Sequence, residues 1–454
     1  MGPMGDPAET YAASTPGSAR LYQEARRHIA GGVSRSTIHL RPHPLYVARG
    51  EGARVWDVDG TGRLDCIGNY TALIHGHGHP AVVAALERQL TRGTAFAAAT
   101  GEEVALAREL RERLPSVELL HFANSGTEAT MYAMRLARAH TGRPAIARFE
   151  GCYHGSHDAA EVSVAPAALD AAGPDDAPLP VAESPGITDA VLADTIVLPY
   201  NDPAAAASIL RRERHRVAGV IIDPLMSATG LVPARPEFLH ELRRVTEELG
   251  MVLIFDEVIS FRVGRSGLQG RYGVRPDLTT LGKIIGGGLP VAAFGGRADL
   301  MRQLDPESER PMPHGGTYNG HALGMAAGLA AMRELTPEAF DQLERRGEWV
   351  RNQLAELFAD HRVPGQATGL GSLFNVHLTD AELVDHRSVR RSQPARLAHR
   401  FVLGMLNHGV LMASRGLGAV CTPMTDADLR AFTAAADQVL AELFARGRLR
   451  DDRT

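Results

Sequence analysis

Short apolar segments alternate with amphipathic ones along most of the chain, and this alternation restricts the fold more than any other feature of the sequence. Apolar runs typical of buried strands lie at residues 117–122, 145–149, 217–222, 251–255, 278–281 and 291–294. Segments with helical periodicity lie beside them, at residues 80–92, 102–113, 127–141 and 236–249. This order predicts an α/β fold in which helices cover both faces of an open, mostly parallel sheet.

The two ends of the chain predict a different architecture. A helix is expected at residues 19–30, and three short segments around the Asp59-Gly60 turn, at 45–49, 53–57 and 63–67, predict a small antiparallel sheet. Beyond residue 320 the pattern is mostly helical, with one strand at 371–377 and a final helix from about residue 426. A chain of 454 residues exceeds what one core usually supports. We therefore expect a disordered terminus at 1–18, a small domain built from 19–75 and 326–454, and a large domain at 76–325.

Composition and charge exclude several classes of protein. The formal net charge is −5, and the basic residues are dispersed apart from runs at 211–216 and 387–396. Neither run has interleaved aromatic side chains, so we expect solvated faces there and no nucleic-acid partner. No stretch approaches the roughly 18 consecutive apolar residues of a membrane span. Cys66, Cys152 and Cys421 are odd in number and far apart, which favours a reducing, cytoplasmic location.

Lys283 is the only lysine among the 48 lysine and arginine residues of the chain. An arginine can replace a lysine that supplies only charge, but a guanidinium cannot lose its proton and attack a carbonyl. Residues 281–288 around it are apolar or glycine, which leaves room for a bound cofactor. An arginine-rich bias that left one lysine by chance is the alternative interpretation of this residue taken alone.

Residues 124–129 follow a predicted strand and begin a predicted helix. Small residues and hydroxyls at such a helix start favour an anion such as a phosphate, although Ser125 with Glu128 is also an ordinary capping arrangement. A second candidate is Asp256, at the carboxyl end of the strand at 251–255, where ligands of α/β sheets are bound. Capping of the next helix or exposure to solvent fits Glu257 better than Asp256.

An anion site, a strand-end acid and a nucleophilic amine are together what pyridoxal phosphate requires. The acid keeps the pyridine nitrogen protonated, and the amine forms the Schiff base. A nucleotide-binding P-loop is excluded, because no glycine lies five residues before Gly282 and no Ser or Thr follows Lys283.

These motifs resemble class III pyridoxal-phosphate aminotransferases, and within them most closely the glutamate-1-semialdehyde aminomutase branch. The similar segments are residues 124–129, 150–155, 256–258, 276–290, 294–297 and 315–320. The resemblance covers nearly the whole chain from about residue 20. It implies a transferase of fold type I, with a large cofactor-binding domain around a mostly parallel seven-stranded sheet and a small α+β domain from both termini.

The resemblance also implies residue roles and an obligate homodimer with shared active sites. Lys283 forms the Schiff base and moves a proton between substrate and cofactor. The other implied contacts are Ser125, Gly126 and Thr127 on the phosphate, Tyr153 and Val258 on the two ring faces, Asp256 on the ring nitrogen, and Thr317 on the phosphate of the neighbouring subunit.

Substrate preference depends on two loops. The aminomutases carry a glutamate in the loop that corresponds to residues 412–419, but this loop contains no acid here. Together with residues 34–36, the loop is similar to β-phenylalanine aminotransferases, which implies that Arg35 and Arg415 bind carboxylates and that Tyr70 contacts the amine donor. We therefore expect a ping-pong transfer from a β-amino acid to 2-oxoglutarate or pyruvate. The alternatives are the intramolecular aminomutase reaction and a cofactor-binding regulatory protein without catalysis.

Two further segments qualify this interpretation. Relatives carry Glu-Pro where this chain has Asp223-Pro224, and a Gln or Asn for the ring hydroxyl where residues 225–230 offer Met226 and Ser227 instead. Ser227 is a candidate replacement. His75, His77 and His79 alternate with glycine, but no acid or cysteine complements them in sequence and relatives carry a similar turn without metal, so no metal site is expected.

Overall fold

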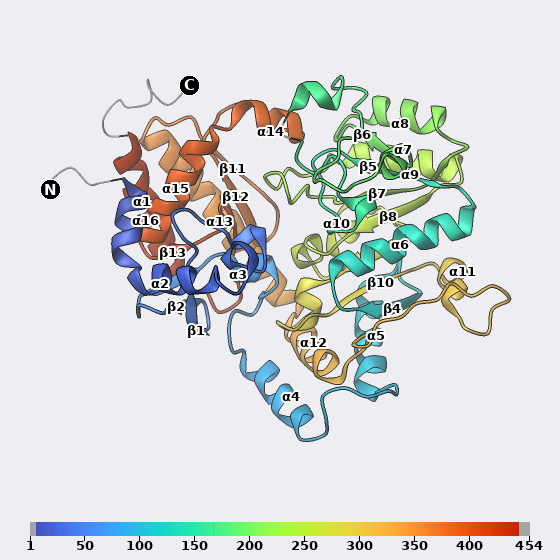
Figure 1. The fold of residues 1–454 in the computed structure, drawn as a ribbon, viewed down its shortest axis with the longest axis horizontal. Helices are drawn as coiled ribbons and strands as arrows, with labels where there is room; N and C mark the ends of the chain where they lie inside the picture. Colours follow the sequence, from blue (N-terminus) through green and yellow to red (C-terminus); the bar gives the residue numbers. More distant parts are fainter. Residues whose placement is uncertain (1–5, 167, 445–454) are drawn as a thin grey trace. The chain divides into compact units, whose positions relative to one another are not determined.

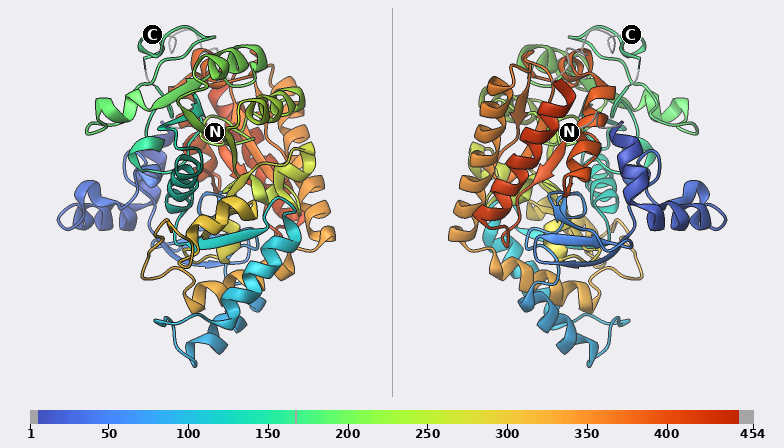
Figure 2. Two further views of the ribbon diagram at one scale, coloured as in Figure 1. Left: turned by 90° about the vertical axis from the view of Figure 1, so that its right-hand side faces the viewer. Right: turned by 90° about the vertical axis from the view of Figure 1, so that its left-hand side faces the viewer.

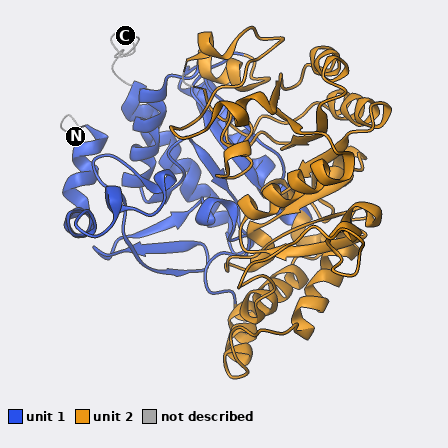
Figure 3. Cartoon of the chain, turned by 45° about the vertical axis from the view of Figure 1, so that its right-hand side comes forward, with its two compact units in different colours: residues 1–79, 341–381, 392–454 blue, residues 80–340, 382–391 orange. Residues whose placement is uncertain are grey.

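The computed structural model describes residues 6–166 and 168–444, which form two compact units (Figure 3). Of the described residues, the smaller unit contains 6–79, 341–381 and 392–444, and the larger one contains 80–166, 168–340 and 382–391. The boundary thus falls after residue 340, not at 325, because α12 (Ala322–Glu334) packs against α4 (Pro80–Leu90) and α5 (Gly101–Arg113) of the larger unit.

A seven-stranded sheet forms the centre of the larger unit, which confirms the expected α/β class (Figure 1). Its strand order is β4 (Leu119–Ala123), β10 (Ala292–Gly296), β9 (Leu278–Leu281), β8 (Val252–Asp256), β7 (Val217–Ile222), β5 (Ala145–Phe149) and β6 (Thr195–Leu198). β10 runs antiparallel to both of its neighbours, and the remaining pairs are parallel. The sequence analysis missed β6, a strand of four residues at the edge of the sheet.

Helices cover both faces of this sheet, so its central strands are apolar on both sides. In β5, Ile146 packs with residues of α6 (Gly126–Thr141), whereas Ala147 and Phe149 pack with residues of α8 (Pro203–Arg212) and α9 (Pro236–Glu248). Successive side chains of a strand point to opposite faces, and both positions are filled by apolar residues here. The sheet is therefore buried on both sides, and its exposed functional positions lie at the strand ends.

The smaller unit is built from both ends of the chain. One sheet has the order β1 (Val47–Glu51), β2 (Arg54–Asp57), β3 (Gly62–Asp65) and β13 (Val410–Leu411), and a second has the order β11 (Gln366–Thr368), β12 (Leu373–His377) and β14 (Leu417–Ala419). Its longer helices are α13 (Pro337–Asp360), α15 (Ala395–Asn407) and α16 (Asp426–Phe444). The last two lie side by side (Figure 2). The parallel pairing of β13 with β3 joins the C-terminal part of the chain to the N-terminal sheet.

Short helices complete both units. They are α3 (Gly68–Thr71), α7 (Asp189–Ala193), α10 (Gly267–Tyr272), α11 (Ala298–Met301) and α14 (His386–Ser392). Single 3₁₀ turns are η1 (Ala30–Gly32), η2 (Ser36–Ile38), η3 (Asp158–Ala160), η4 (Leu169–Ala172), η5 (Ser260–Val263), η6 (Lys283–Gly286) and η7 (Arg302–Leu304). Over the residues described, none of the helices has the length and apolar character needed to cross a membrane.

The expectation of a disordered terminus at residues 1–18 is wrong from residue 7 onward, and residues 1–5 lie outside the described part. Two helices, α1 (Pro7–Ser14) and α2 (Pro16–Ala25), replace it. The Asp6 carboxylate accepts a hydrogen bond from the Ala8 N–H at 3.1 Å, and Pro7 occupies the first helical position. Tyr11 is fully buried and packs with residues of α15, so tertiary packing stabilises a segment of poor helical pattern.

Candidate functional site

The candidate site lies at one edge of the seven-stranded sheet. Strands β5, β7, β8 and β9 are parallel, and β4 points the same way because β10 is antiparallel to both β4 and β9. Their carboxyl ends therefore meet at one edge, where α/β proteins bind ligands. The polar residues that follow these five strands are Asn124 to Thr127, Tyr153 and His154, Asp223, Asp256, and Lys283.

Lys283 begins η6, is separated from the end of β9 by Gly282 alone, and is partly buried. Burial lowers the pKa of its ammonium, whereas the carboxylates of Asp256 and Asp223 oppose that shift. In the described part of the chain, its Nζ makes no hydrogen bond and no ion pair within 4 Å. An amine with a lowered pKa and no committed partner suits nucleophilic attack on a carbonyl carbon.

Asp256 is the last residue of β8 and is buried. Its Oδ1 accepts hydrogen bonds from the Thr280 hydroxyl at 3.0 Å and the Val258 N–H at 3.1 Å, and its Oδ2 lies 2.8 Å from His154 Nδ1. These contacts fix the plane of the carboxylate. The sequence analysis assigned no role to His154 or Thr280, although His154 lies within the similar segment at 150–155.

Glu257 has the structural role expected for it. Its buried carboxylate accepts hydrogen bonds from the N–H groups of Leu268 and Gln269, both at 2.9 Å, at the start of α10. It therefore holds the next helix and does not face the site.

The helix start after β4 combines a cap with free backbone donors. Ser125 Oγ accepts a hydrogen bond from the Glu128 N–H at 3.2 Å, and Glu128 Oε2 accepts one from the Asn124 N–H at 2.7 Å. The capping interpretation of this segment therefore holds. Among the described residues, no acceptor lies on the N–H groups of Gly126 and Thr127, which remain available to an anion at the helix N-terminus.

Val258 packs between two glycines that the sequence analysis placed near the cofactor. A Cβ atom on Gly126 would lie 3.1 Å from Val258 Cγ1, and one on Gly282 would lie 3.2 Å from the same atom. Any larger residue at either position would displace this side chain. Val258 thus touches both the anion-binding turn and the residue before Lys283, a position that fits contact with one face of an aromatic ring.

Tyr153 is 42% exposed, and its hydroxyl lies 3.0 Å from Ser156 Oγ. The turn that carries it contacts the helix start, because Thr127 Oγ1 accepts a hydrogen bond from the Ser156 N–H at 3.2 Å. A large exposed ring beside this turn fits the second face of a planar ligand. Thr317, the last expected phosphate contact, is exposed.

Asp223 and Ser227 interact with each other at the end of β7. The Ser227 hydroxyl donates to Asp223 Oδ2 at 2.5 Å, and the Ser227 N–H donates to the same atom at 2.9 Å. Burial and the charge of Asp256 raise the pKa of Asp223. Because the single hydroxyl proton of Ser227 is engaged, this residue is a poor donor to a ring hydroxyl.

The smaller unit brings together the three residues expected to contact substrate. The guanidinium carbon of Arg35 lies 5.9 Å from the centre of the Tyr70 ring, and Arg35 Nη1 donates to Asn69 Oδ1 at 2.9 Å. The Tyr70 hydroxyl donates to the Thr37 carbonyl. Burial raises the pKa of Tyr70, and the charges of Arg35 and Arg415 oppose this rise, so Arg415 lies within electrostatic reach of the same ring. Arg35 beside this phenol, together with the charge of Arg415 that acts on it, gives a positive environment suited to carboxylates.

The turn that contains His75, His77 and His79 differs from the sequence prediction in its polar partners. An acid does complement it, since His77 Nε2 lies 2.8 Å from Asp65 Oδ2. His75 Nδ1 lies 3.1 Å from the Thr422 hydroxyl instead. In the described residues no group of three His, Cys, Asp or Glu side chains is arranged to hold a metal ion.

The residues at the sheet edge match the needs of pyridoxal phosphate on chemical grounds. Free N–H groups at a helix start fit its phosphate, the fixed carboxylate of Asp256 fits its ring nitrogen, and the amine of Lys283 fits its aldehyde. The ring-hydroxyl contact is the one position for which no donor is evident, because Ser227 turns to Asp223.

Comparison with known proteins adds independent findings. A sequence model of the family aminotransferase class-III matches residues 37–434. Glutamate-1-semialdehyde 2,1-aminomutase of Roseiflexus castenholzii is 41% identical over 433 residues, which cover 94% of this chain and 97% of that protein. An omega-transaminase from Sphaerobacter thermophilus has a TM-score of 0.91 at 44% identity, over 95% of this chain and 99% of that one. A β-phenylalanine aminotransferase from Variovorax paradoxus has a TM-score of 0.87 at 37% identity, over 95% of each chain.

Proposed function

Because the chain belongs to the class III aminotransferase family, and is therefore a pyridoxal-phosphate-dependent enzyme, we propose that it transfers the amino group of a β-amino acid to a 2-oxo acid. The acceptor is 2-oxoglutarate or pyruvate, and the two substrates react in turn by a ping-pong mechanism. The observation that carries the proposal is the cluster of Arg35 and Arg415 around Tyr70, which offers cations to the carboxylates of donor and acceptor.

The residues of the larger unit have distinct roles in this proposal. When bound, pyridoxal phosphate supplies an aldehyde carbon that accepts the amino group and a ring that delocalises the electrons of the broken C–H bond. Lys283 Nζ would hold the cofactor through its aldehyde carbon and would carry the proton at the substrate carbon. Asp256 keeps the ring nitrogen protonated, and His154 and Thr280 hold its carboxylate in plane.

The remaining contacts orient the cofactor. Ser125, Gly126 and Thr127 bind the phosphate at the start of α6. Val258 and Tyr153 lie against the two faces of the ring and exclude water from it. These residues would hold the ring in one orientation relative to Lys283, and fixed orientation of reacting groups lowers the barrier of a reaction.

Intramolecular transfer on glutamate 1-semialdehyde is the second candidate, favoured by the aminomutase relative at 41% identity. The composition of residues 412–419 argues against it, because this loop lacks the glutamate of that branch. The aminomutase would form aminolevulinate without any added oxo acid. A transaminase requires the acceptor for every second half-reaction, so omission of the acceptor separates the two functions.

We further propose a cytoplasmic homodimer in which Thr317 reaches the phosphate of the other copy. Leu90, Phe96, Val104 and Tyr318 of the larger unit are 57%, 50%, 59% and 60% exposed. They lie on or beside α4, α5 and α12, and both α4 and α5 pack against α12. Large apolar side chains exposed on neighbouring elements favour burial against a partner.

The test uses the purified enzyme loaded with pyridoxal phosphate and single amino donors of the α, β and ω classes, without acceptor. We expect a β-amino acid to remove the visible absorbance of the bound cofactor and a 2-oxo acid to restore it. Arg35→Gln and Arg415→Gln should raise KM for carboxylate substrates, with an amine that lacks a carboxylate as the control. The proposal is refuted if no β- or ω-amino donor changes the spectrum.

A further inference from the structure

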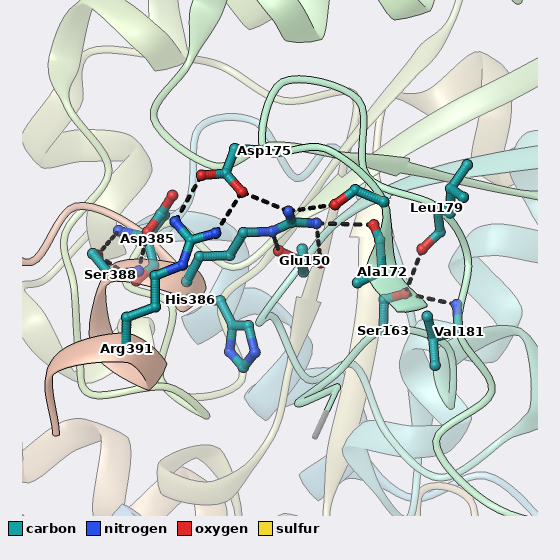
Figure 4. A network of polar contacts seen from close by, with 12 residues as sticks. Glu150, Ser163, Ala172, Asp175, Leu179, Val181, Asp385, His386, Ser388 and Arg391 are labelled. Carbon is teal, nitrogen blue, oxygen red and sulfur yellow. Dashed lines mark hydrogen bonds and ion pairs between the residues drawn. The ribbon is translucent and has the colours of Figure 1, made fainter. Parts of the chain in front are cut away.

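A segment from the C-terminal part of the chain packs onto the larger unit and reaches the turn that carries Tyr153. Residues 382–391, which include most of α14, belong to the larger unit although the residues on either side of them belong to the smaller one. Arg387 of this segment donates hydrogen bonds to Glu150, which follows β5, and to Ala172 and Gly173 of the long loop. Figure 4 shows Glu150, Ala172 and Asp175 within this network of polar contacts. The sequence analysis expected the arginine run at 387–396 to be solvated, but Arg387 is only 3% exposed.

Arg387 uses every donor of its guanidinium. Its Nε and Nη2 donate to the two carboxylate oxygens of buried Glu150, at 2.7 and 3.0 Å. The remaining N–H groups donate to the carbonyls of Ala172 and Gly173, at 2.9 and 2.7 Å, and to Asp175 Oδ1 at 2.7 Å. A guanidinium has five donors in a fixed plane, and a lysine ammonium could not reproduce this set.

One end of this network fixes the turn at residues 150–155. Glu150 directly precedes Gly151, whose carbonyl accepts a hydrogen bond from the Thr229 hydroxyl at 2.9 Å. A Cβ atom on Gly151 would lie 2.5 Å from His386 Cβ, so α14 packs directly on this turn. The Gly151 N–H donates to the Ser163 carbonyl at 3.0 Å. The path of the backbone toward Tyr153 therefore depends on α14.

The other end fixes the loop at residues 165–188. The Ala172 and Gly173 carbonyls bound by Arg387 belong to this loop, and Asp175 is shared with Arg391 at 2.7 Å. Ser163 continues the connection, because its hydroxyl donates to the Leu179 carbonyl at 3.3 Å and accepts from the Val181 N–H at 3.0 Å. The same arginine thus contacts both the loop and the base of the Tyr153 turn.

We propose that Arg387 is a positioning residue that couples the order of the loop at 165–188 to the seating of the Tyr153 ring against the cofactor. Without its guanidinium, both oxygens of the buried Glu150 side chain lose the donors that hold the base of the turn, and an ionised Glu150 is also left without its counter-charge. The loop loses two carbonyl contacts and one carboxylate contact at the same time. This inference rests on the role proposed above for Tyr153 and adds a residue far from it in sequence.

The experiment compares four variants of the full chain. Arg387→Met removes all five hydrogen bonds. Arg387→Lys retains the positive charge but lacks the planar guanidinium group. The double variant R387M/E150Q also removes the unpaired buried charge. Arg391→Gln is the matched control, because it lies in the same segment and loses only an exposed ion pair with Asp175.

Three readouts distinguish positioning from a purely structural ion pair. They are the dissociation constant for pyridoxal phosphate in an absorbance titration of the apoenzyme, the circular dichroism of the bound cofactor, and the rate of proteolysis within residues 165–188. For Arg387→Met we expect an affinity about tenfold or more weaker, as is typical for residues behind a ligand contact, together with reduced cofactor dichroism and faster cleavage. The double variant should regain the wild-type melting temperature but not these three properties. Arg387→Lys should keep the melting temperature and still be cleaved faster, and Arg391→Gln should match the wild type.

Two results would overturn the inference. One is a folded double variant with the cofactor affinity, dichroism and protease resistance of the wild type. The other is equal behaviour of Arg387→Lys and the wild type in all three readouts. The proposed function fails separately, and this inference with it, if the wild-type enzyme itself binds no cofactor. If the wild type converts donors and the variants equal it, only the inference about Arg387 is overturned.

Discussion

Lys283 shows how residue type and environment act together. The chain contains one lysine, which the fold places just beyond β9, separated from the end of the strand by Gly282 alone. Burial lowers the pKa of its amine, and the carboxylates of Asp256 and Asp223 oppose this shift. In the proposed function the neutral amine attacks the cofactor carbonyl, so the fraction of neutral amine would set the rate of cofactor attachment. The surrounding carboxylates therefore determine the pH dependence of that step.

Cofactor attachment to the apoenzyme should become faster as pH rises, with a midpoint below the ordinary lysine pKa of about 10.4. Because the charge of Asp223 raises the pKa of Lys283, Asp223→Asn should move this midpoint to lower pH. Stopped-flow absorbance across a pH series measures the midpoint. Asp299→Asn, which loses a contact with exposed Arg297, serves as the control. A midpoint that moves to higher pH in Asp223→Asn would contradict the assigned electrostatics.

Lys283→Arg should abolish turnover and borohydride-dependent attachment of the cofactor, because a guanidinium stays protonated. Intact mass after reduction measures attachment. Since no other lysine exists in the chain, the α-amino group is the only competing amine. Turnover at the wild-type rate would show that another residue carries the proton.

The site residues proposed from sequence differ from the missed ones in the information that reveals them, which is side-chain type and local position for the first group and long-range contacts for the second. Lys283 and Asp256 were identified because their side-chain chemistry and their place after apolar strands are visible in one dimension. His154 and Arg387 act through buried contacts with Asp256 and Glu150, which are 102 and 237 positions away. In sequence, the arginine run around Arg387 resembles a solvated surface. Its burial depends on contacts with the loop at 165–188, which the sequence does not show.

At the level of elements, the turn that carries Tyr153 lies close to the turn that begins α6. Gly155 has a φ of +102°, and a Cβ atom there would lie 2.6 Å from Thr127 Cα. The backbone of the Tyr153 turn can therefore approach the phosphate-binding turn only through glycine.

Gly155→Ala should displace Thr127 and weaken cofactor binding by about tenfold or more, since strained backbone of this kind costs about 1–3 kcal/mol. Titration of the apoenzyme with pyridoxal phosphate measures the effect. Gly264→Ala is the matched control, because a Cβ atom at Gly264 would meet open space and its φ of −170° is ordinary extended backbone. Equal affinities of the two variants would argue against this contact.

Strands and helices were predicted to within a few residues wherever their hydrophobic period was strong, as in β5 and β7, whose bounds match the expected ones. The elements that were missed include α8 (Pro203–Arg212), β6 and α1. The edge strand β6 has four residues, too few to show a period. Helix α1 has a weak pattern and is held by burial of Tyr11 and a cap from Asp6, both of which depend on the folded chain.

On the scale of the whole molecule, the two units carry different parts of the proposed function. The larger one presents the candidate cofactor residues, and the smaller one presents the arginine cluster for carboxylates. In the proposed function, the choice of amino donor depends on Arg35, Tyr70 and Arg415 of the smaller unit.

The enzyme should elute as a dimer, and the double variant F96E/V104E should shift it toward monomer, because two charges in an apolar interface cannot be desolvated. Size-exclusion chromatography with light scattering measures the mass. Arg212→Glu, at an exposed position at the end of α8, is the control. A wild-type monomer at all concentrations would contradict the shared active site and with it the role of Thr317.

The most direct test of intermolecular amino transfer follows the nitrogen atom itself. The loaded enzyme is given a ¹⁵N-labelled β-amino acid and unlabelled 2-oxoglutarate or pyruvate, and both products are analysed by mass spectrometry. We predict one labelled α-amino acid for each oxo acid formed from the donor, with no transfer in Lys283→Arg. If the label stays on the donor skeleton or fails to reach any acceptor, the assignment of a transaminase is contradicted.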